Sequence, residues 1–557
     1  MKESKLCIQY KLAGESKIIK EESYQTIDYT IEETCSSENV KLVITPKKDI
    51  ELVSVELKYM HPTKTSERFY INGYQAWTTS REVCVDDKQK GLTPLTKITK
   101  TGFDLAALSG DYYFIKYPKT SGKFHSFTYT YYRRENEVEL YGSLNERTGF
   151  TVFYADMNEG TFTIAKDVEG VTINAQESYE LINVNKYVGE YDSVFDAYFK
   201  DLNCAKPRID HMAGYTSWYN YFQKIDEDII IRDLKGIARV KEHVGIFQID
   251  DGYEPYVGDW LDPSPKFPKG MKYIADEIHN EGYLAGIWIA PFSAQHNSRL
   301  TKEHPDWLLK DSKGKLAKGV FAWGGAYTLD IYNEGAREYM RNFFDVILNE
   351  WGYDMVKLDF LYSQCIHPRN GKSRGQIMAE AMDFLRECVG DKLLLGCGVP
   401  LGSCFGVVDA CRISCDVDLK YKGKFYNKLG INQELPSAQN AMTNTIFRRH
   451  LDGRAFCNDP DVFFLRDFNL TFTMQQKKLL AKVNNLFGNV LFVSDDVGRY
   501  GDEEIEIIKK AFNKSQAIII SAEYTDKDYV TIKYLENGER KTLQFDMLNG
   551  ETSSELL

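Results

Sequence analysis

The sequence predicts a chain of several domains: an N-terminal antiparallel β domain, a central (β/α)8 barrel and a small C-terminal antiparallel β domain. The length of 557 residues is more than one domain usually needs. Strand-like patterns fill the first 200 residues or so, and strand and helix patterns alternate after about His211. We therefore place the predicted domain boundaries at residues 1–205, 206–512 and 513–557.

The N-terminal part shows runs of β-branched and aromatic residues, of which 40–44 and 127–132 are examples. Gly and Asn-Glu turn signals separate these runs, and long helical periodicity is absent until about Ser193. A large antiparallel sandwich fits this pattern. One loop, 72–77, begins with an Asn-Gly turn and ends at Trp77. Trp77 either contacts a ligand from this loop or packs within its own domain.

The central part contains eight strand candidates, and helical patterns separate most of them. Eight strands with helical crossovers over roughly 280 residues match the size of a (β/α)8 barrel. The strands are expected at 213–218, 245–250, 284–290, 355–360, 393–397, 411–414, 455–459 and 490–494, and the helices at 227–240, 270–281, 334–351, 375–389 and 474–487. The last residues return to strand patterns at 517–521, 528–534 and 541–546, which we interpret as a small β domain.

The fourth barrel strand carries the strongest candidate for chemistry. Lys357 and Asp359 are two residues apart, so their side chains point to the same face of the strand. Catalytic groups of barrel enzymes lie at the C-terminal ends of the strands, where Asp359 is expected. An aspartate that a neighbouring ammonium keeps ionised can act as a covalent nucleophile. The alternative is a buried structural Lys–Asp pair.

Further polar residues follow the other predicted strands. The second strand ends in Asp250-Asp251-Gly252, and two adjacent carboxylates are costly to bury without partners, so we expect them at a wet or ligand-filled mouth; a loop turn or helix cap is the alternative. Carboxylates at several strand ends together indicate a site that binds hydroxyl groups. The other candidates at the strand ends are Trp288, Cys397, Gly398, Arg412, Asp416 and the acidic residues of 458–461 and 494–496.

Composition excludes several classes of function. The net charge of −12, with no cluster of Lys and Arg in the sequence, argues against nucleic acid and against an anionic membrane surface. Residues 1–5 are not followed by an apolar run of signal-peptide length, so we expect a cytoplasmic protein. The odd number of 11 cysteines favours free thiols. No zinc-site spacing, phosphate loop or dinucleotide fingerprint occurs, so we expect no metal and no cofactor.

The motifs together resemble glycoside hydrolase family 36, the α-galactosidase and α-N-acetylgalactosaminidase family. Phe247-Gln248-Ile249-Asp250-Asp251-Gly252-Tyr253, Lys357-Leu358-Asp359, the 72–77 loop and Asn458-Asp459-Pro460-Asp461 carry the resemblance. It extends over the whole chain and is strongest in residues 213–500. Two stretches depart from the family pattern: Trp323-Gly324-Gly325 stands where some members have an arginine, and Gly398-Val399-Pro400-Leu401-Gly402 replaces a glycine-rich run.

The resemblance implies an N-terminal β-supersandwich and a role for each candidate. Asp359 would be the nucleophile and Asp416 the general acid/base of a retaining hydrolase that needs no cofactor. Asp250 and Asp251 would accept hydrogen bonds from O4 and O6 of galactose, and Lys357 would contact the sugar. Trp218 and Trp288 would form apolar walls, and Cys397 and Arg412 would lie near C2 and O2.

The resemblance leaves several functions open. The expected reaction is hydrolysis of terminal α-linked galactose from an oligosaccharide or glycoconjugate by double displacement. An α-N-acetylgalactosaminidase with the same mechanism is the alternative, because the small Gly398 leaves room for a larger C2 substituent. A different α-glycosidase and a sugar-binding protein without activity are further alternatives. The sequence leaves homo-oligomerisation open.

Overall fold

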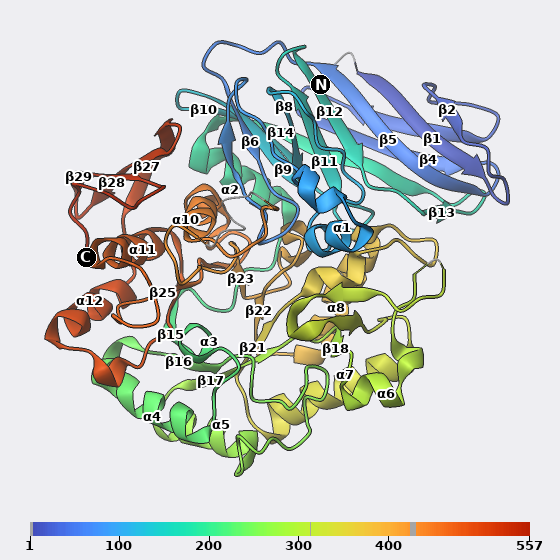
Figure 1. The fold of residues 1–557 in the computed structure, drawn as a ribbon. Coiled ribbons are helices and arrows are strands. Elements are labelled where there is room, and N and C mark those ends of the chain that lie inside the picture. The colour runs from blue at the N-terminus through green and yellow to red at the C-terminus, as the bar shows by residue number, and fades with distance from the viewer. Residues whose placement is uncertain (1–3, 312, 424–430) are drawn as a thin grey trace.

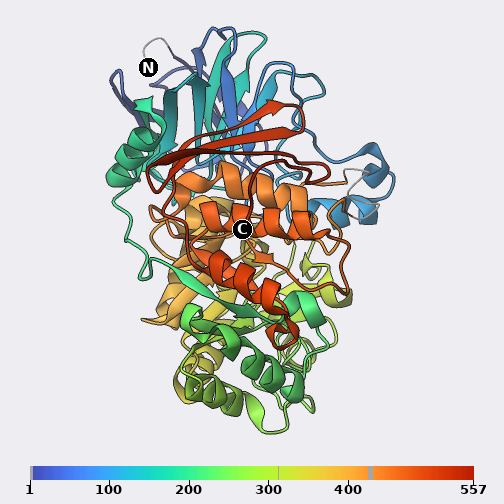
Figure 2. The ribbon, with the colours of Figure 1, turned by 90° about the vertical axis from the view of Figure 1, so that its left-hand side faces the viewer.

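The computed structural model describes residues 4–311, 313–423 and 431–557. The N-terminal sheets form the upper half of the molecule and the barrel the lower half (Figure 1). The short C-terminal sheet lies across the boundary between the two (Figure 2). In the described residues, no helix is long and apolar enough to cross a membrane.

The N-terminal part consists of two seven-stranded antiparallel sheets. Strand β4 shows why they form: Val40, Leu42 and Ile44 alternate with more exposed residues and are completely buried, as one apolar face of a sheet requires. One sheet has the order β2 (Ile19–Glu21), β1 (Lys5–Leu12), β5 (Ile50–Met60), β12 (Thr161–Lys166), β11 (Thr151–Asp156), β8 (Lys123–Phe127), with β13 (Thr172–Ile173) beside β5. The other has the order β3 (Tyr29–Cys35), β4 (Asn39–Pro46), β14 (Tyr179–Glu190), β10 (Glu137–Ser143), β9 (Tyr129–Arg134), β6 (Arg68–Ile71), β7 (Arg81–Val83).

Two sequence expectations for this part need correction. The run 127–132, expected as one strand, is divided between β8 and β9 of different sheets, because Thr128 between them has a φ of +68°. A helix, α1 (Lys100–Ala107), also precedes the expected onset of helical structure at α2 (Tyr191–Leu202). Thr99 caps α1 by accepting a hydrogen bond from the Gly102 amide.

The central part is one parallel sheet of nine strands, and it contains all eight expected strands. The seventh expected strand, 455–459, forms β24, which pairs with β23; a further short strand, β25, pairs with β26, and Pro460 and Asp461 separate the two. Proline cannot donate to a strand ladder, which explains the break. Because β24 and β25 are continuous in the chain, the curled sheet returns on itself. Its order is β24 (Cys457–Asp459), β23 (Ala410–Arg412), β22 (Leu393–Gly396), β21 (Met355–Leu358), β17 (Leu284–Ile289), β16 (Ile246–Ile249), β15 (Met212–Thr216), β26 (Val490–Val493), β25 (Val462–Phe463).

The helices between these strands lie outside the sheet (Figure 1). All five expected helices are present, and Ser373 and Thr473 begin two of them with capping boxes. The helix expected at 334–351 ends as an α-helix at Asp345 and continues as a π-helical turn, Val346–Glu350. The helices are α3 (Trp218–Tyr221), α4 (Glu227–Ile237), α5 (Gly270–Asn280), α6 (Arg299–Glu303), α7 (Glu334–Asp345), α8 (Arg374–Val389), α10 (Ala438–Phe447), α11 (Met474–Phe487) and α12 (Asp502–Phe512).

Two small antiparallel sheets complete the fold. One, with the order β18 (Ser293–Gln295), β20 (Ala326–Thr328), β19 (Lys318–Val320), follows barrel strand β17. The other is the C-terminal sheet of β27 (Ile518–Asp526), β28 (Tyr529–Glu536) and β29 (Glu539–Asp546), as expected. It docks on α10, where the ring of Tyr524 stacks on Phe447 at 5.5 Å between centroids.

A buried arginine joins the N-terminal part to the barrel. Arg448, at the end of α10, is 0% exposed. Its guanidinium donates to the carbonyl oxygens of Gln75 at 3.1 Å and Thr78 at 3.0 Å, and to that of Ile413 beyond β23 at 2.6 Å. Hydrogen bonds from a charged donor are strong, so this side chain holds the 72–78 loop against the barrel mouth.

Candidate active site

The C-terminal ends of the barrel strands bring most of the predicted site residues together. Parallel strands end at the same rim of a sheet. Asp250 follows β16, Asp359 follows β21, and Asp416 lies four residues after β23. Trp288 is the next-to-last residue of β17 and pairs in register with Lys357 of β21.

Asp359 is held by two donors. The indole Nε1 of Trp288 donates to its Oδ2 at 3.1 Å, and the backbone N–H of Phe360 donates to its Oδ1 at 2.7 Å. Phe360 has a φ of +56°, an uncommon conformation for a residue other than glycine, and it turns the chain sharply after the carboxylate. Trp288, predicted as an apolar wall, therefore also acts as a hydrogen-bond donor.

The environment of Asp359 has opposing effects on its ionisation. Burial raises the pKa of Asp359, the Lys357 ammonium opposes this rise, and the Asp416 carboxylate adds to it. The Cys397 thiol, itself kept protonated because burial raises its pKa, and the Trp288 indole both favour the ionised form. The net result is a pKa above the usual value for aspartate. The influence of Asp416 shows that the two candidate catalytic carboxylates share one electrostatic environment.

Lys357 has a different partner from the one expected. Its Nζ lies 2.9 Å from Oδ2 of Asp250, which follows β16 two strands away in the sheet, and it acts on Asp359 only through its charge. Burial lowers the pKa of Lys357, but the Asp250 carboxylate more than compensates and the pKa rises above its usual value. The ammonium therefore stays charged beside Asp359.

Asp250 and Asp251 are buried at the end of β16 and are held by side-chain donors. Their exposed fractions are 2% and 3%. Asp250 accepts from Gln248 Nε2 at 2.8 Å, besides Lys357. Asp251 accepts from Gln223 Nε2 at 3.0 Å and from Trp323 Nε1 at 2.7 Å. These hydrogen bonds offset the free-energy cost of burying two adjacent carboxylates.

Arg412 is surrounded by acidic residues. Its Nη1 lies 2.9 Å from Asp416, its Nη2 2.8 Å from Asp461 and its Nε 3.4 Å from Asp459. Every guanidinium nitrogen thus faces a carboxylate, and the bond from Nη1 orients Asp416. Asp416 remains 37% exposed while Arg412 is buried. Burial, partly offset by Arg412, raises the pKa of Asp461 to about 7.

Trp77 from the N-terminal part reaches the rim of the site. Its ring packs edge-on against Phe360 and Tyr362, at 5.4 and 5.7 Å between centroids. It also covers Gly398, where an added Cβ would lie 2.8 Å from the indole. The small Gly398 is therefore required by Trp77 and by its own φ of +57°.

Trp218 is the predicted site residue that the described contacts do not join to this cluster. It begins α3 and packs edge-on against Phe222 at 5.1 Å. The acidic pair after the eighth expected strand is also structural. Asp495 is paired with Arg466, and Asp496 accepts from the Gly498 amide.

Sequence reasoning missed Trp323 and Glu254. Trp323 lies between β19 and β20, in the stretch that departs from the pattern of some family members, and its ring contacts Trp288 at 5.9 Å and Phe360 at 5.1 Å. Glu254 is buried beside Asp251, and burial and the Asp251 charge raise its pKa well above the usual value. The departure at 323–325 was a signal for Trp323; nothing marked Glu254. In the described residues, no group of three or more His, Cys, Asp or Glu side chains could hold a metal ion.

A parallel barrel whose strand ends carry a fixed aspartate, a second carboxylate and hydrogen-bonding acidic residues is the architecture of a glycoside hydrolase. Comparison with known proteins gives the same class. Residues 218–380 match the family model Melibiase. This stretch contains β16, β17 and β21 and ends within α8.

Curated relatives match the same part of the chain. The chain is 31% identical over 153 residues to an A type blood alpha-D-galactosamine galactosaminidase of Flavonifractor plautii, covering 25% of this chain and 14% of that protein. It is 27% identical over 196 residues to alpha-galactosidase 1 of Pediococcus pentosaceus, covering 30% of this chain and 26% of that protein. The aligned part thus spans about a quarter or less of these relatives.

A solved structure is similar over nearly the whole fold. The alpha-galactosidase TtGalA of Thermus thermophilus, in complex with p-nitrophenyl alpha-D-galactopyranoside, superposes with a TM-score of 0.71 at 23% identity. The match covers 92% of this chain and 98% of that chain. Together these matches confirm the resemblance to glycoside hydrolase family 36.

Proposed function

We propose that this chain is a retaining exo-α-galactosidase that removes terminal α-linked galactose from an oligosaccharide or glycoconjugate. The observation that carries the proposal is the placement of Asp359 after β21. Two donors, Trp288 and the Phe360 amide, fix its carboxylate, and the Lys357 and Asp416 charges act on it. The names of the relatives support galactosides as the substrate class.

Two carboxylates suffice for the reaction. Asp359 attacks C1 of the galactose while Asp416 transfers its proton to the departing glycosidic oxygen, so a β-glycosyl ester forms as the glycosidic bond breaks. Asp416 then takes a proton from water, and the water oxygen attacks C1 and releases Asp359. Two inversions leave the product in the α configuration. Retaining enzymes hold such carboxyls roughly 5–5.5 Å apart.

The surroundings of the two aspartates suit their different tasks. The donors to Asp359 fix the orientation of its two carboxylate oxygens and favour the ionised form that a nucleophile needs. Asp416 is held by Arg412 and is the more exposed of the two, as an acid/base that meets leaving groups and water should be. Asp250 and Asp251, each fixed by nitrogen donors, would accept hydrogen bonds from the axial O4 and from O6.

The alternative substrate is an α-linked N-acetylgalactosamine, because one relative is named a galactosaminidase. The alpha-galactosidases among the relatives favour a free 2-hydroxyl, which remains our choice.

The test is a panel of nitrophenyl α-galactoside, α-N-acetylgalactosaminide and α-glucoside, assayed with the full chain and with Asp359→Asn. We expect the highest kcat/KM for the α-galactoside and loss of nearly all turnover in the variant, since an amide cannot form the glycosyl ester. Activity of Asp359→Asn within tenfold of the unchanged chain would remove Asp359 from its role. A preference for the acetamido sugar would change the substrate and keep the mechanism.

A further inference from the structure

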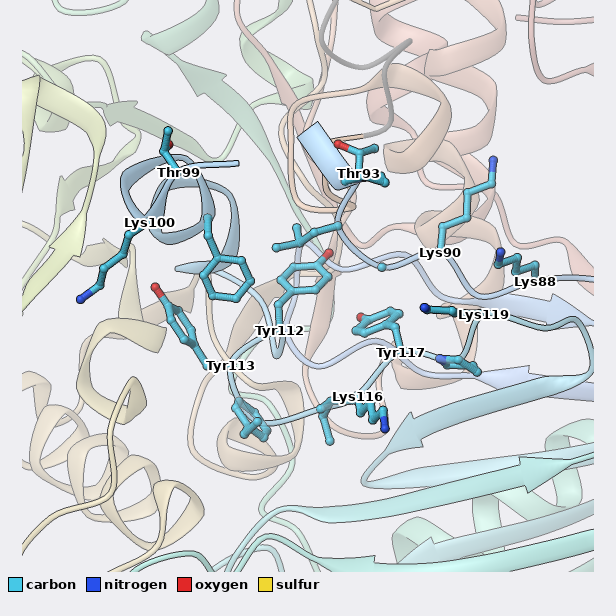
Figure 3. Close-up of a pocket in the computed structure, with 17 residues that line it drawn as sticks. Lys88, Lys90, Thr93, Thr99, Lys100, Tyr112, Tyr113, Lys116, Tyr117 and Lys119 are labelled. Atoms are coloured by element: carbon cyan, nitrogen blue, oxygen red, sulfur yellow. The ribbon is translucent and has the colours of Figure 1, made fainter. Parts of the chain in front are cut away.

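A second concave site lies in the N-terminal part. Residues between β7 and β8, including α1, form a cavity of about 1320 Å³ (Figure 3). Figure 1 shows α1 at the boundary between the N-terminal sheets and the barrel. Small-molecule sites usually measure about 300–1000 Å³, so this cavity has room for several linked sugar rings.

Aromatic rings form the wall of the cavity. The rings of Tyr112 and Tyr117 stack at 5.2 Å, and Phe103 meets Tyr113 edge-on at the same distance. Hydrogen bonds from their hydroxyl groups fix two of the tyrosines. Tyr113 donates to Asp104 at 2.9 Å, and Tyr117 donates to Asp111 at 2.8 Å. Rigid aromatic surfaces offer large contact area at little cost in entropy, and they suit the apolar faces of pyranose rings.

Five exposed lysines surround these rings. Lys88, Lys90, Lys116 and Lys119 lie on one side of the tyrosines, and Lys100 lies on the opposite side (Figure 3). Within the described part of the chain, none of the five forms an ion pair. The chain as a whole carries a net charge of −12, so five unpaired ammonium groups at one cavity stand out. They are spread over 32 positions, which is why the sequence shows no basic cluster.

The cavity is connected to the candidate active site through direct contacts. Tyr112, in the wall, donates to Glu434 at 2.9 Å, and Thr78 donates to the other oxygen of Glu434 at 2.9 Å. Thr78 follows Trp77, whose ring packs on Phe360 beside the candidate nucleophile. The wall of the cavity and the rim of the candidate active site are therefore joined through one carboxylate, that of Glu434.

We propose that this cavity binds an anionic saccharide, one carrying sulfate or carboxylate groups, with its rings against the tyrosines and its charges against the lysines. Resting on the proposed function, the occupant is the part of the α-galactoside that remains after galactose is removed. Unpaired lysines around a concave surface raise the local concentration of anions, and carbohydrate rings need the aromatic wall that a simple ion would not.

Binding is tested with probes that lack α-galactose, so that the result does not depend on hydrolysis. Calorimetry uses a sulfated heparin trisaccharide, trigalacturonic acid and neutral maltotriose with the full chain. The pocket variant is Lys116→Gln/Lys119→Gln. Its matched control is Lys58→Gln/Lys64→Gln, which removes the same charge from two exposed lysines of the same domain that have no ion pair. We expect about tenfold weaker binding in the pocket variant alone, since an exposed ion pair contributes up to roughly fivefold.

Binding of the heparin trisaccharide or of trigalacturonic acid would support the proposal. The tighter of the two shows whether the site prefers sulfate or carboxylate groups. It should weaken at high salt, because exposed charges are screened. Equal binding of maltotriose, equal loss in both lysine variants, or no binding of either anionic probe would overturn it. Nitrophenyl α-galactoside turnover should be unchanged in the pocket variant. With an α-galactosylated sulfated oligosaccharide, KM should rise about as much as the binding falls, at unchanged kcat. Loss of turnover on both substrates would instead count against the proposed function.

Discussion

Replacement of Trp288 by phenylalanine tests the role of Asp359 without altering either candidate catalytic residue. The change removes the Nε1–H that donates to Asp359 at 3.1 Å and keeps an aromatic ring for packing against Trp260 and Trp323. This donor favours the ionised carboxylate, so its loss should raise the pKa of Asp359. A nucleophile acts only when ionised, so the acid limb of the pH profile should move to higher pH.

The structure also sets the size of the shift. A hydrogen bond to a charged group contributes about 1.5–3 kcal/mol, and the 3.1 Å distance places this one at the lower end. With about 1.4 kcal/mol per pKa unit, the acid limb should move up by about one unit. Above that limb kcat should change much less, because the nucleophile loses its charge as it attacks and one donor matters less in the transition state.

The assay is the pH dependence of kcat/KM for nitrophenyl α-galactoside. Trp260→Phe is the matched control: Trp260 packs against Trp288 at 5.8 Å, and its own Nε1 is buried without a hydrogen-bond partner in the described residues. Its acid limb should stay in place. An unmoved acid limb in Trp288→Phe, with activity and fold retained, would show that ionisation of Asp359 does not control the reaction.

Three further changes have defined outcomes. Asp416→Ala should slow substrates with poor leaving groups far more than aryl glycosides, and azide should restore part of the activity as a glycosyl azide; equal losses without azide product would point to another acid. Lys357→Met leaves a buried carboxylate without its partner and should cost about 3–5 kcal/mol of stability, seen as a lower Tm; an unchanged Tm would contradict the ion pair. Gly398→Ala forces a methyl group to 2.8 Å from the Trp77 indole at a positive φ, and should lower Tm more than the control Gly453→Ala, which has positive φ and open space.

The sequence by itself predicted the order of the sheets, the barrel strands and the placement of Asp250 and Asp359 at the strand ends. Periodicity separates strand from helix, and parallel strands must end at one rim, so a carboxylate that follows a buried strand is placed almost without knowledge of other contacts. Asp250 and Asp359 follow from this rule, and all eight expected strands are present.

Tertiary structure decided which groups meet at that rim. Strand register turned Lys357 toward Asp250, while a tryptophan on the neighbouring strand bonds Asp359. Tertiary packing decided the rest: Trp77 covers Gly398 from another part of the chain, and five lysines from residues 88–119 surround one cavity. Periodicity reports which face a side chain points to; it carries no information on what the rest of the chain places opposite, because that depends on packing between elements far apart in sequence.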